Sequence, residues 1–211
     1  MSPANRSRAR DRPLKRSKVQ SRRSKAPAGW RPRPVRIHNS HPRLRLDRRA
    51  VIAVIQCLDL HAAEILGRRA CRRLSTLDSG PSAAPGVPPG ELSLAFLTDS
   101  VLARLHATFL DNASKTDVIT FAGAPAGGLV PTGSGLAGEI CLSADAARAF
   151  AAKHARNFSE ELTLYLVHGW LHLAGQDDLR PKNKKHMRAA EARALALLRA
   201  GRKIPRFAFT G

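Results

Sequence analysis

The chain has 211 residues, 43% of them hydrophobic, and its formal net charge is +20 with a sequence pI ≈ 11.5. A chain of this length holds one domain with extensions, and no apolar run reaches the roughly 18 residues that a membrane-spanning helix needs. No apolar signal-peptide core follows the basic beginning either. The three cysteines, Cys57, Cys71 and Cys141, are odd in number and far apart, which argues against a disulfide framework and a thiolate zinc site and fits a reducing cytosol.

The positive charge is concentrated at the beginning of the chain. Residues 1–34 contain twelve Lys and Arg side chains against the single acid Asp11, a local charge of +11. Almost no apolar residue accompanies them, so this segment is predicted to be a disordered basic tail. Basic arms of this kind bind nucleic-acid phosphates without sequence specificity. A solvated tail without a dedicated role remains the alternative, and a transit peptide is disfavoured because no amphipathic apolar face is present.

The next segment reads as the beginning of a folded domain. Residues 35–38 and 44–46 are predicted strands separated by a turn at Pro42. From residue 48 to about 73 the apolar residues recur at helical spacing, which predicts one long helix. Residues 78–90 contain four prolines and three glycines, a composition that predicts a flexible insertion within the domain.

Strands and helices then alternate. Alternating or β-branched apolar residues predict three strands, and apolar periodicities behind capping residues predict two helices. The strands are residues 92–96, 118–121 and 139–142; the helices are 98–109 and 143–154; a loop rich in Gly and Pro covers 123–135. A final helix is predicted to begin at Pro181 and to end near Gly201.

The most informative stretch lies on a helix predicted to begin at Ser159. His168 and His172 are four residues apart, which places both imidazoles on one helix face within reach of one metal ion. Gly175 favours the end of the helix, so that Asp177 or Asp178 can reach the open side of the ion. Two surface histidines are the alternative for such a pair. The apolar residues before it, the glycine and the two carboxylates favour the metal site.

Two imidazoles and one carboxylate leave an open coordination position, which is typical of catalytic rather than structural zinc. Such a site lowers the pKa of bound water to around 7 and can direct its attack on a phosphodiester. A zincin-like peptidase is a more distant alternative. Its general base would be a glutamate beside the first histidine, where this chain has Gly169, a residue that also allows close approach of a neighbouring strand.

Three ordered blocks carry a resemblance to a known family. The run from His168 to Asp178 resembles the signature H-G-x-L-H-L-x-G-x-D-H of the YbeY family of ribosomal-RNA maturation factors, with Asp178 in place of the last histidine. Residues 116–121 resemble the family's T-D-V-L-S-F strand, and residues 138–140 resemble its G-D-I strand. The resemblance covers about the last two thirds of the chain, and ordered blocks are more specific than one motif.

The resemblance implies an α+β fold, with a small mixed β-sheet of about four strands covered by helices and a zincin-like metal-site helix, over residues 35–205. It implies a metal-dependent, single-strand-specific endoribonuclease that matures the 3′ end of 16S ribosomal RNA in ribosome biogenesis, with ribosomal RNA and the small subunit as partners. His168 and His172 match the first two metal ligands, and Asp178 stands at the third. One Zn²⁺ is expected, and the carboxylate also suits Mn²⁺.

The resemblance also points to a departure at the site. An arginine that family members carry before the T-D-V strand falls on Leu110, and leucine cannot hold a phosphate as an arginine fork does. Lys115 is the candidate replacement, although a solvated turn lysine is the simpler interpretation. A second hypothesis is therefore a ribosome-assembly or RNA-binding factor that keeps a structural metal and has little nuclease activity. Glu191 is a candidate hydrogen-bond partner for a metal-binding histidine.

Overall fold

A four-stranded sheet in the order β1–β3–β5–β4 forms the centre of the structure. The structure is a computed structural model, and it describes residues 30–67, 88–110, 116–123 and 135–210. The sheet is mixed: β3 pairs in parallel with β1 and β5, and β4 pairs with β5 in the antiparallel sense. The predicted α+β class, with a mixed sheet of about four strands, is therefore confirmed. The strands are β1 Val35–Asn39, β3 Glu91–Leu97, β4 Val118–Ala122 and β5 Leu136–Ser143.

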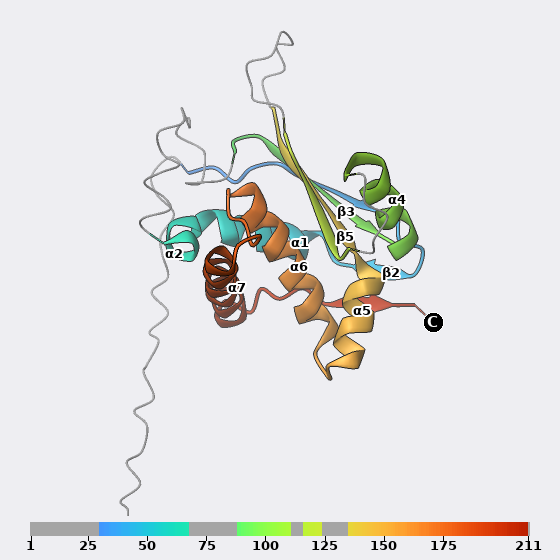
Figure 1. Ribbon diagram of the computed structural model, residues 1–211. Coiled ribbons are helices and arrows are strands. Elements are labelled where there is room, and N and C mark those ends of the chain that lie inside the picture. The colour runs from blue at the N-terminus through green and yellow to red at the C-terminus, as the bar shows by residue number, and fades with distance from the viewer. Residues whose placement is uncertain (1–29, 68–87, 111–115, 124–134, 211) are drawn as a thin grey trace, which may run out of the picture.

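Helices cover both faces of the sheet, and alternate residues of β3 show which helix covers which face. Leu92, Leu94 and Phe96 belong to the larger core cluster, while Ala95 and Leu97 belong to the smaller one. This alternation follows from the two-residue period of a strand. The larger cluster lies under α1 (Arg48–Leu60), α2 (Ala62–Leu66), α6 (Phe158–Leu173) and α7 (Pro181–Ala200); the smaller lies under α4 (Asp99–Leu110) (Figure 1).

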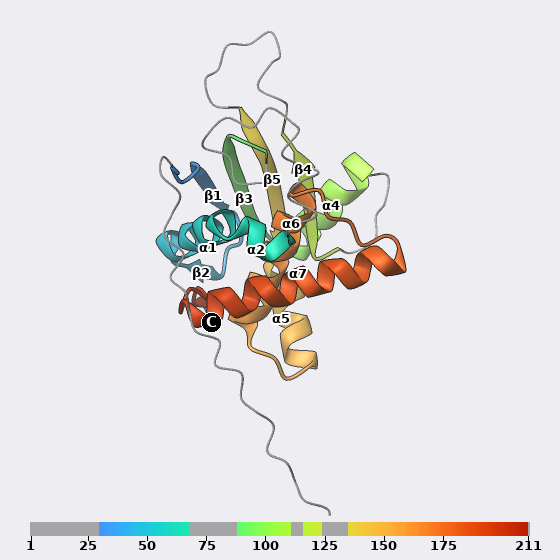
Figure 2. The ribbon, with the colours of Figure 1, turned by 90° about the vertical axis from the view of Figure 1, so that its left-hand side faces the viewer.

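The last long helix, α7, packs against α6 and runs beside α1 and α2 (Figure 2). It begins at Pro181, as predicted, because proline lacks the N–H that a first turn leaves unpaired. The helix α5 (Ala144–Lys153) is capped by Ser143, whose hydroxyl accepts the N–H of Ala146 at 3.0 Å. In the described residues, no helix combines the length and apolar character needed to cross a membrane.

Several predicted boundaries differ from the structure. The single helix predicted from residue 48 is broken at His61, whose ψ of 16° separates α1 from α2. Its predicted end near residue 73 and most of the 78–90 insertion lie outside the described residues. Helix α6 is capped by Asn157, not by Ser159. The hydroxyl of Ser159 instead accepts the N–H of Phe207 at 3.0 Å, a tertiary contact that local propensity does not reveal.

A short C-terminal strand was not predicted. β6 (Phe207–Phe209) pairs in the antiparallel sense with β2 (Leu44–Leu46), forming a second, two-stranded sheet. Three residues carry too short a pattern to identify a strand. Phe207 is buried against Phe96 and Phe158, so packing rather than periodicity places this segment.

The basic segment assigned to residues 1–34 is held against the domain at its end. Arg33 donates to the carboxylate of Asp59 at 2.6 Å, and both side chains are almost fully buried. The indole of Trp170 donates to the other oxygen of Asp59 at 3.0 Å. Burial raises the pKa of Asp59, and the charge of Arg33 with the two hydrogen bonds partly offsets that effect. Arg33 therefore belongs to the folded domain, whereas residues 1–29 lie outside the described residues.

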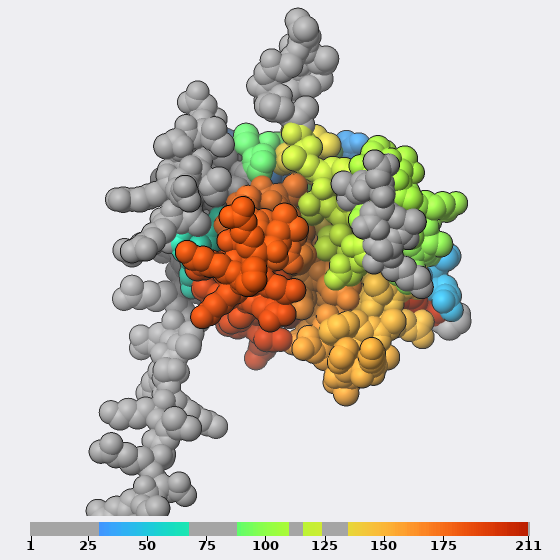
Figure 3. All heavy atoms as spheres, viewed as in Figure 1, coloured from blue at the N-terminus to red at the C-terminus, as the bar shows by residue number. Residues whose placement is uncertain are grey.

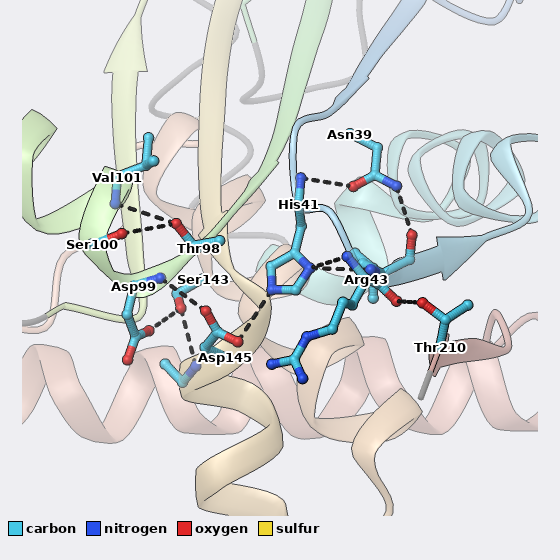
Figure 4. Close-up of polar contacts among 12 residues, drawn as sticks. Asn39, His41, Arg43, Thr98, Asp99, Ser100, Val101, Ser143, Asp145 and Thr210 are labelled. Carbon is cyan, nitrogen blue, oxygen red and sulfur yellow. Dashed lines mark hydrogen bonds and ion pairs between the residues drawn. The ribbon is translucent and has the colours of Figure 1, made fainter.

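A polar network joins the carboxyl ends of the three parallel strands (Figure 4). The Nδ1 atom of buried His41 accepts two backbone N–H groups of the following turn, so its proton is on Nε2, which donates to Asp145 at 3.1 Å. Asp145 also accepts the N–H of Asp99 at 3.2 Å, and the hydroxyl of Ser143 donates to the Asp99 carboxylate. His41 and Asp145 thus have structural partners that join these strand ends.

Candidate metal centre

The helix α6 brings the two predicted histidine ligands together on one face. The Nε2 atoms of His168 and His172 are 2.9 Å apart, and the two rings meet edge to face with centroids 4.5 Å apart. Spacing of four residues produces this arrangement because one helical turn places their side chains one above the other. Both side chains are partly exposed, so a ligand can reach them from solvent.

The end of α6 orients His172. Gly175 has a φ of +77°, and its N–H and that of Gln176 donate to the carbonyls of His172 and Leu171 at 2.9 and 3.0 Å. This is a Schellman motif, in which glycine adopts left-handed angles at little steric cost. The turn points the carbonyl of Gln176 back toward the helix, where it accepts from Nδ1 of His172 at 3.1 Å.

Glu191 of α7 orients the other histidine. Its carboxylate accepts from Nδ1 of His168 at 2.7 Å, across 23 residues of sequence. A carboxylate behind an imidazole is the usual support of a metal-binding histidine, because it fixes the ring and makes the ligand nitrogen more basic. The sequence identified Glu191 as a candidate for this contact, and the structure places it there.

These two hydrogen bonds decide where the protons lie. The carboxylate and the carbonyl are acceptors, so Nδ1 donates in both rings, and each neutral ring has its lone pair on Nε2. Two lone pairs then face each other at 2.9 Å. Such a pair is stable only with a cation beside it, either a proton on one ring or a metal ion bound by both. The donor set therefore fits a metal ion.

Asp178 completes the group. One of its carboxylate oxygens lies 4.0 Å from Nε2 of His172, and ligand atoms of the three side chains lie within 4.8 Å of one another. The neighbouring Asp177 is engaged elsewhere: its carboxylate accepts from the side-chain amide of Asn183 at 2.8 and 2.9 Å. Of the two carboxylates that the sequence offered, the structure brings Asp178 to the histidines and uses Asp177 to join the loop to α7.

The surrounding charges act differently on the two histidines. Burial lowers the pKa of His168, but the hydrogen bond and charge of Glu191 outweigh it, so the net shift is upward. The pKa of His172 is lowered, first by burial and then by the charge of His168. The pair therefore holds one proton more readily than two, and a metal ion that binds it must displace that proton.

Gly169 sets the distance between the site helix and the sheet. A Cβ atom there would lie 2.5 Å from Cγ2 of Ile140, and 3.2 and 3.3 Å from methyl groups of Val118 and Thr120. The close approach of a strand, which the sequence offered as the reason for this glycine, is confirmed. No glutamate fits at this position, so the arrangement of a zinc peptidase is absent. Trp170 is fully buried, as expected of a core residue.

The two other predicted site residues, Leu110 and Lys115, fall at or beyond the edge of the described residues. Leu110 is the last residue of α4, and nothing is described of its side chain. Lys115 lies outside the described residues. A hollow of about 450 Å³ borders the centre, with His168, Glu191, Arg188 and Arg156 among its lining residues. No sequence pattern points to the two arginines, because charged surface residues carry no local signal of a shared cavity.

Comparison with known proteins gives consistent names. The family model described as Endoribonuclease YbeY matches residues 71–199. The protein named Endoribonuclease YbeY from Salinibacter ruber is 30% identical over 162 residues, which cover 76% of this chain and 88% of that protein. The Porphyromonas gingivalis W83 protein of the same name is 34% identical, over 54% of this chain and 71% of that one.

Two further matches differ in how much of each matched protein they cover. The Endoribonuclease YbeY of Myxococcus xanthus is 37% identical over 107 residues, half of this chain but 35% of that protein. Among solved structures, the solution structure of TM1509 from Thermotoga maritima is 16% identical, with a TM-score of 0.44, and the match covers 80% of this chain and 94% of that one.

Proposed function

The chain belongs to the YbeY family, whose model covers more than half of it, and on that premise we propose that it is a metal-dependent, single-strand-specific endoribonuclease acting in ribosomal-RNA processing. The observation that carries the proposal is the facing pair of Nε2 atoms on α6. Both rings commit their Nδ1 protons to acceptors, so the two lone pairs need a shared cation. A preformed donor pair at the rim of a hollow suits a catalytic ion.

His168, His172 and Asp178 would hold one ion. Two imidazoles and a carboxylate suit Zn²⁺, and the carboxylate also makes Mn²⁺ a candidate. When bound at such a site, a divalent ion lowers the pKa of a coordinated water and offsets the negative charge that develops on a phosphoryl group. Glu191 and the carbonyl of Gln176 keep the two rings in the tautomer that presents Nε2.

The proposed substrate is single-stranded ribosomal RNA, at the 3′ end of the small-subunit 16S RNA, in ribosome biogenesis. The net charge of +20, with +11 in residues 1–34, supports a polyanionic partner, because Lys and Arg side chains release counterions from the RNA backbone. The proposal includes a cytoplasmic location, which is supported by the free, buried thiols of Cys57 and Cys141.

One observation favours a second candidate function. Leu110 stands where the family arginine is expected, and leucine cannot hold a scissile phosphate. The alternative is a ribosome-assembly factor that binds RNA and keeps its metal for stability. The two candidates differ in one measurable property, the cleavage of bound RNA.

The test is a cleavage assay on single-stranded ribosomal RNA with the metal-loaded protein. It compares wild type, His168→Ala, a chelator-treated sample and His38→Ala, a matched control that removes an exposed histidine from β1. We expect wild type and His38→Ala to cleave, and the other two samples to leave the RNA intact. RNA that wild type binds but does not cleave, with metal present, would instead establish the assembly-factor function.

A further inference from the structure

We propose that the groove between α5, α6 and α7 binds single-stranded RNA beside the metal centre, with a base stacked on Phe150, His154 and Arg156 and a phosphate bound by Arg188. This inference rests on the proposed function and deepens it, because it names the surface that would position the strand. The three residues at the end of α5 are called the stacking cluster below.

The groove runs from the metal centre to the stacking cluster. The 450 Å³ hollow is lined by both His168 of the metal centre and Phe150 of the stacking cluster. It shares Asp117, Phe150 and Tyr165 with a second hollow of about 730 Å³ that extends to Lys153, so the two are continuous. In the space-filling view, the beginning of α7 and the loop before it stand forward on one side and α5 on the other, with α6 set back between them (Figure 3). Volumes of this size lie in the range of ligand clefts.

The stacking cluster is an exposed π-surface on a helix built mostly of alanine. Phe150 is 37% exposed, the centroid of the His154 ring lies 4.2 Å from that of its ring, and the guanidinium of Arg156 lies 5.4 Å from the same centroid. The core needs none of the three, since α5 buries only small side chains. Nucleic-acid bases stack on exposed aromatic and guanidinium surfaces, and every base offers a π-face.

The backbone between His154 and Arg156 is held in an uncommon conformation. Ala155 has a φ of +50°, in a Schellman motif closed by the N–H of Arg156 on the carbonyl of Ala151 at 2.8 Å. Glycine would occupy this position at lower energy. The motif fixes Arg156 beside Phe150, and a salt bridge to Glu161 at 3.3 Å holds its head. A non-glycine residue in left-handed conformation at a binding surface is consistent with a functional constraint.

The opposite wall is cationic. Arg188 is exposed and has no ion-pair partner among the residues that the structure describes. Upstream of it on α7 stand exposed Lys182, Lys184 and Lys185, with no acidic residue in the first turn, although the helix dipole favours acids there. The acids that line the two hollows all have partners: Glu161 pairs with Arg156, Glu191 with His168, Asp117 accepts the N–H of Val118, and Asp99 accepts the hydroxyl of Ser143. Among the lining cations, Lys153 and Arg188 have no ion-pair partner in the part of the chain that the structure describes, so both are available to contact RNA phosphate.

The test measures RNA binding by stopped-flow fluorescence with the full-length, metal-loaded protein, in the binding phase before turnover. The probe is a short single-stranded RNA that contains 2-aminopurine, whose fluorescence is quenched on stacking. We expect quenching with wild type, and with Phe150→Ala its loss together with binding about tenfold weaker. Phe150→Trp should keep both, and Phe109→Ala, which removes an exposed phenylalanine of α4, should equal wild type.

The salt dependence of RNA binding tests the phosphate contact of Arg188 separately. Arg188→Gln should lower the slope of log Kd against log salt by about 0.7, the value for one contact to a single-stranded phosphate, and Arg104→Gln on α4 should not. If Phe150→Ala and Arg188→Gln bound RNA as the two control variants do, the proposal that the groove binds RNA would be wrong. Cleavage of the same RNA by wild type is measured separately over longer times. A protein that binds through the groove without cleaving would refute the nuclease and leave the groove intact.

Discussion

Gly169 offers the sharpest test of how the fold positions the metal centre. In Gly169→Ala the new Cβ would lie 2.5 Å from Cγ2 of Ile140, whereas carbon atoms in contact prefer about 3.5–4.0 Å. One of the two must therefore recede by about 1 Å, the difference between these distances. Ile140 is fully buried on β5, between β3 and β4, so the helix α6 must move instead.

The expected magnitude is a balance of two effects. Overpacking of a buried site costs about 1–3 kcal/mol. The better helix propensity of alanine offsets about 1 kcal/mol of that. Because two further methyl groups, of Val118 and Thr120, also lie within 3.3 Å of the new atom, we expect a net loss of about 1–2 kcal/mol. His168 and His172 move with α6 while Glu191 does not, so metal affinity should fall about tenfold.

The assay is urea unfolding of chelated protein, since bound metal would add its own stabilisation. Ile140 supplies the matched controls. Ile140→Ala removes the obstructing Cγ2, so in that background Gly169→Ala should cost less than in the natural background, although the methyl groups of Val118 and Thr120 remain close. Ile140→Val keeps that methyl, and the loss should persist. The reasoning would be refuted if Gly169→Ala in the natural background were as stable as wild type and bound metal equally well.

Four other changes have defined outcomes. Asp178→His should shift preference from Mn²⁺ toward Zn²⁺, and identical competition profiles by metal analysis would remove Asp178 from the ligand set. Ala155→Gly should raise the free energy of unfolding by about 1 kcal/mol, because glycine adopts left-handed backbone angles without the strain of alanine. Ala152→Gly, at an exposed position within α5, should lower the free energy of unfolding by about as much. Changes of the same sign in urea unfolding would contradict the Schellman motif at Ala155. The pKa of Asp59 is raised in the folded state, so the folded protein binds the carboxyl proton more tightly than the unfolded chain does. The stability that this group contributes should therefore fall as pH rises from about 4 through the raised pKa, and the wild type should lose stability relative to Asp59→Asn over that range. Parallel pH profiles of the two proteins would exclude the effect. Deletion of residues 1–29 should weaken RNA binding and flatten its salt dependence, and an unchanged slope would remove this segment from the interface.

Local patterns predicted most elements because their information is local. The capped alanine-rich helix α5 and the proline-initiated helix α7 were found from side chains within one turn of their ends. The failures have a different origin. Asn157 and Ser159 are both good caps, and only the bond from Ser159 to Phe207 decides between them. The strand β6 is too short to carry a period, and its partner β2 lies some 160 residues earlier in the sequence.

The same distinction between local and long-range information applies to the candidate site. The pairing of His168 with His172 follows from helix geometry alone, and Gly175 follows from the need for a left-handed residue after the helix. The sequence could not choose between Asp177 and Asp178, because both lie in the loop after the turn. The bond between Asp177 and Asn183 makes that choice, and it exists because α7 begins beside the loop.

The sequence by itself determined the family, the histidine pair and the helix that carries it, because these depend on residue types at fixed short spacings. Only the tertiary structure decided that Glu191 supports His168, that Arg33 is fixed by Asp59, and that Phe150 and Arg188 face one groove. These contacts join elements far apart in sequence. They follow from which apolar faces pack together when the core excludes water, and residue spacing does not record that choice.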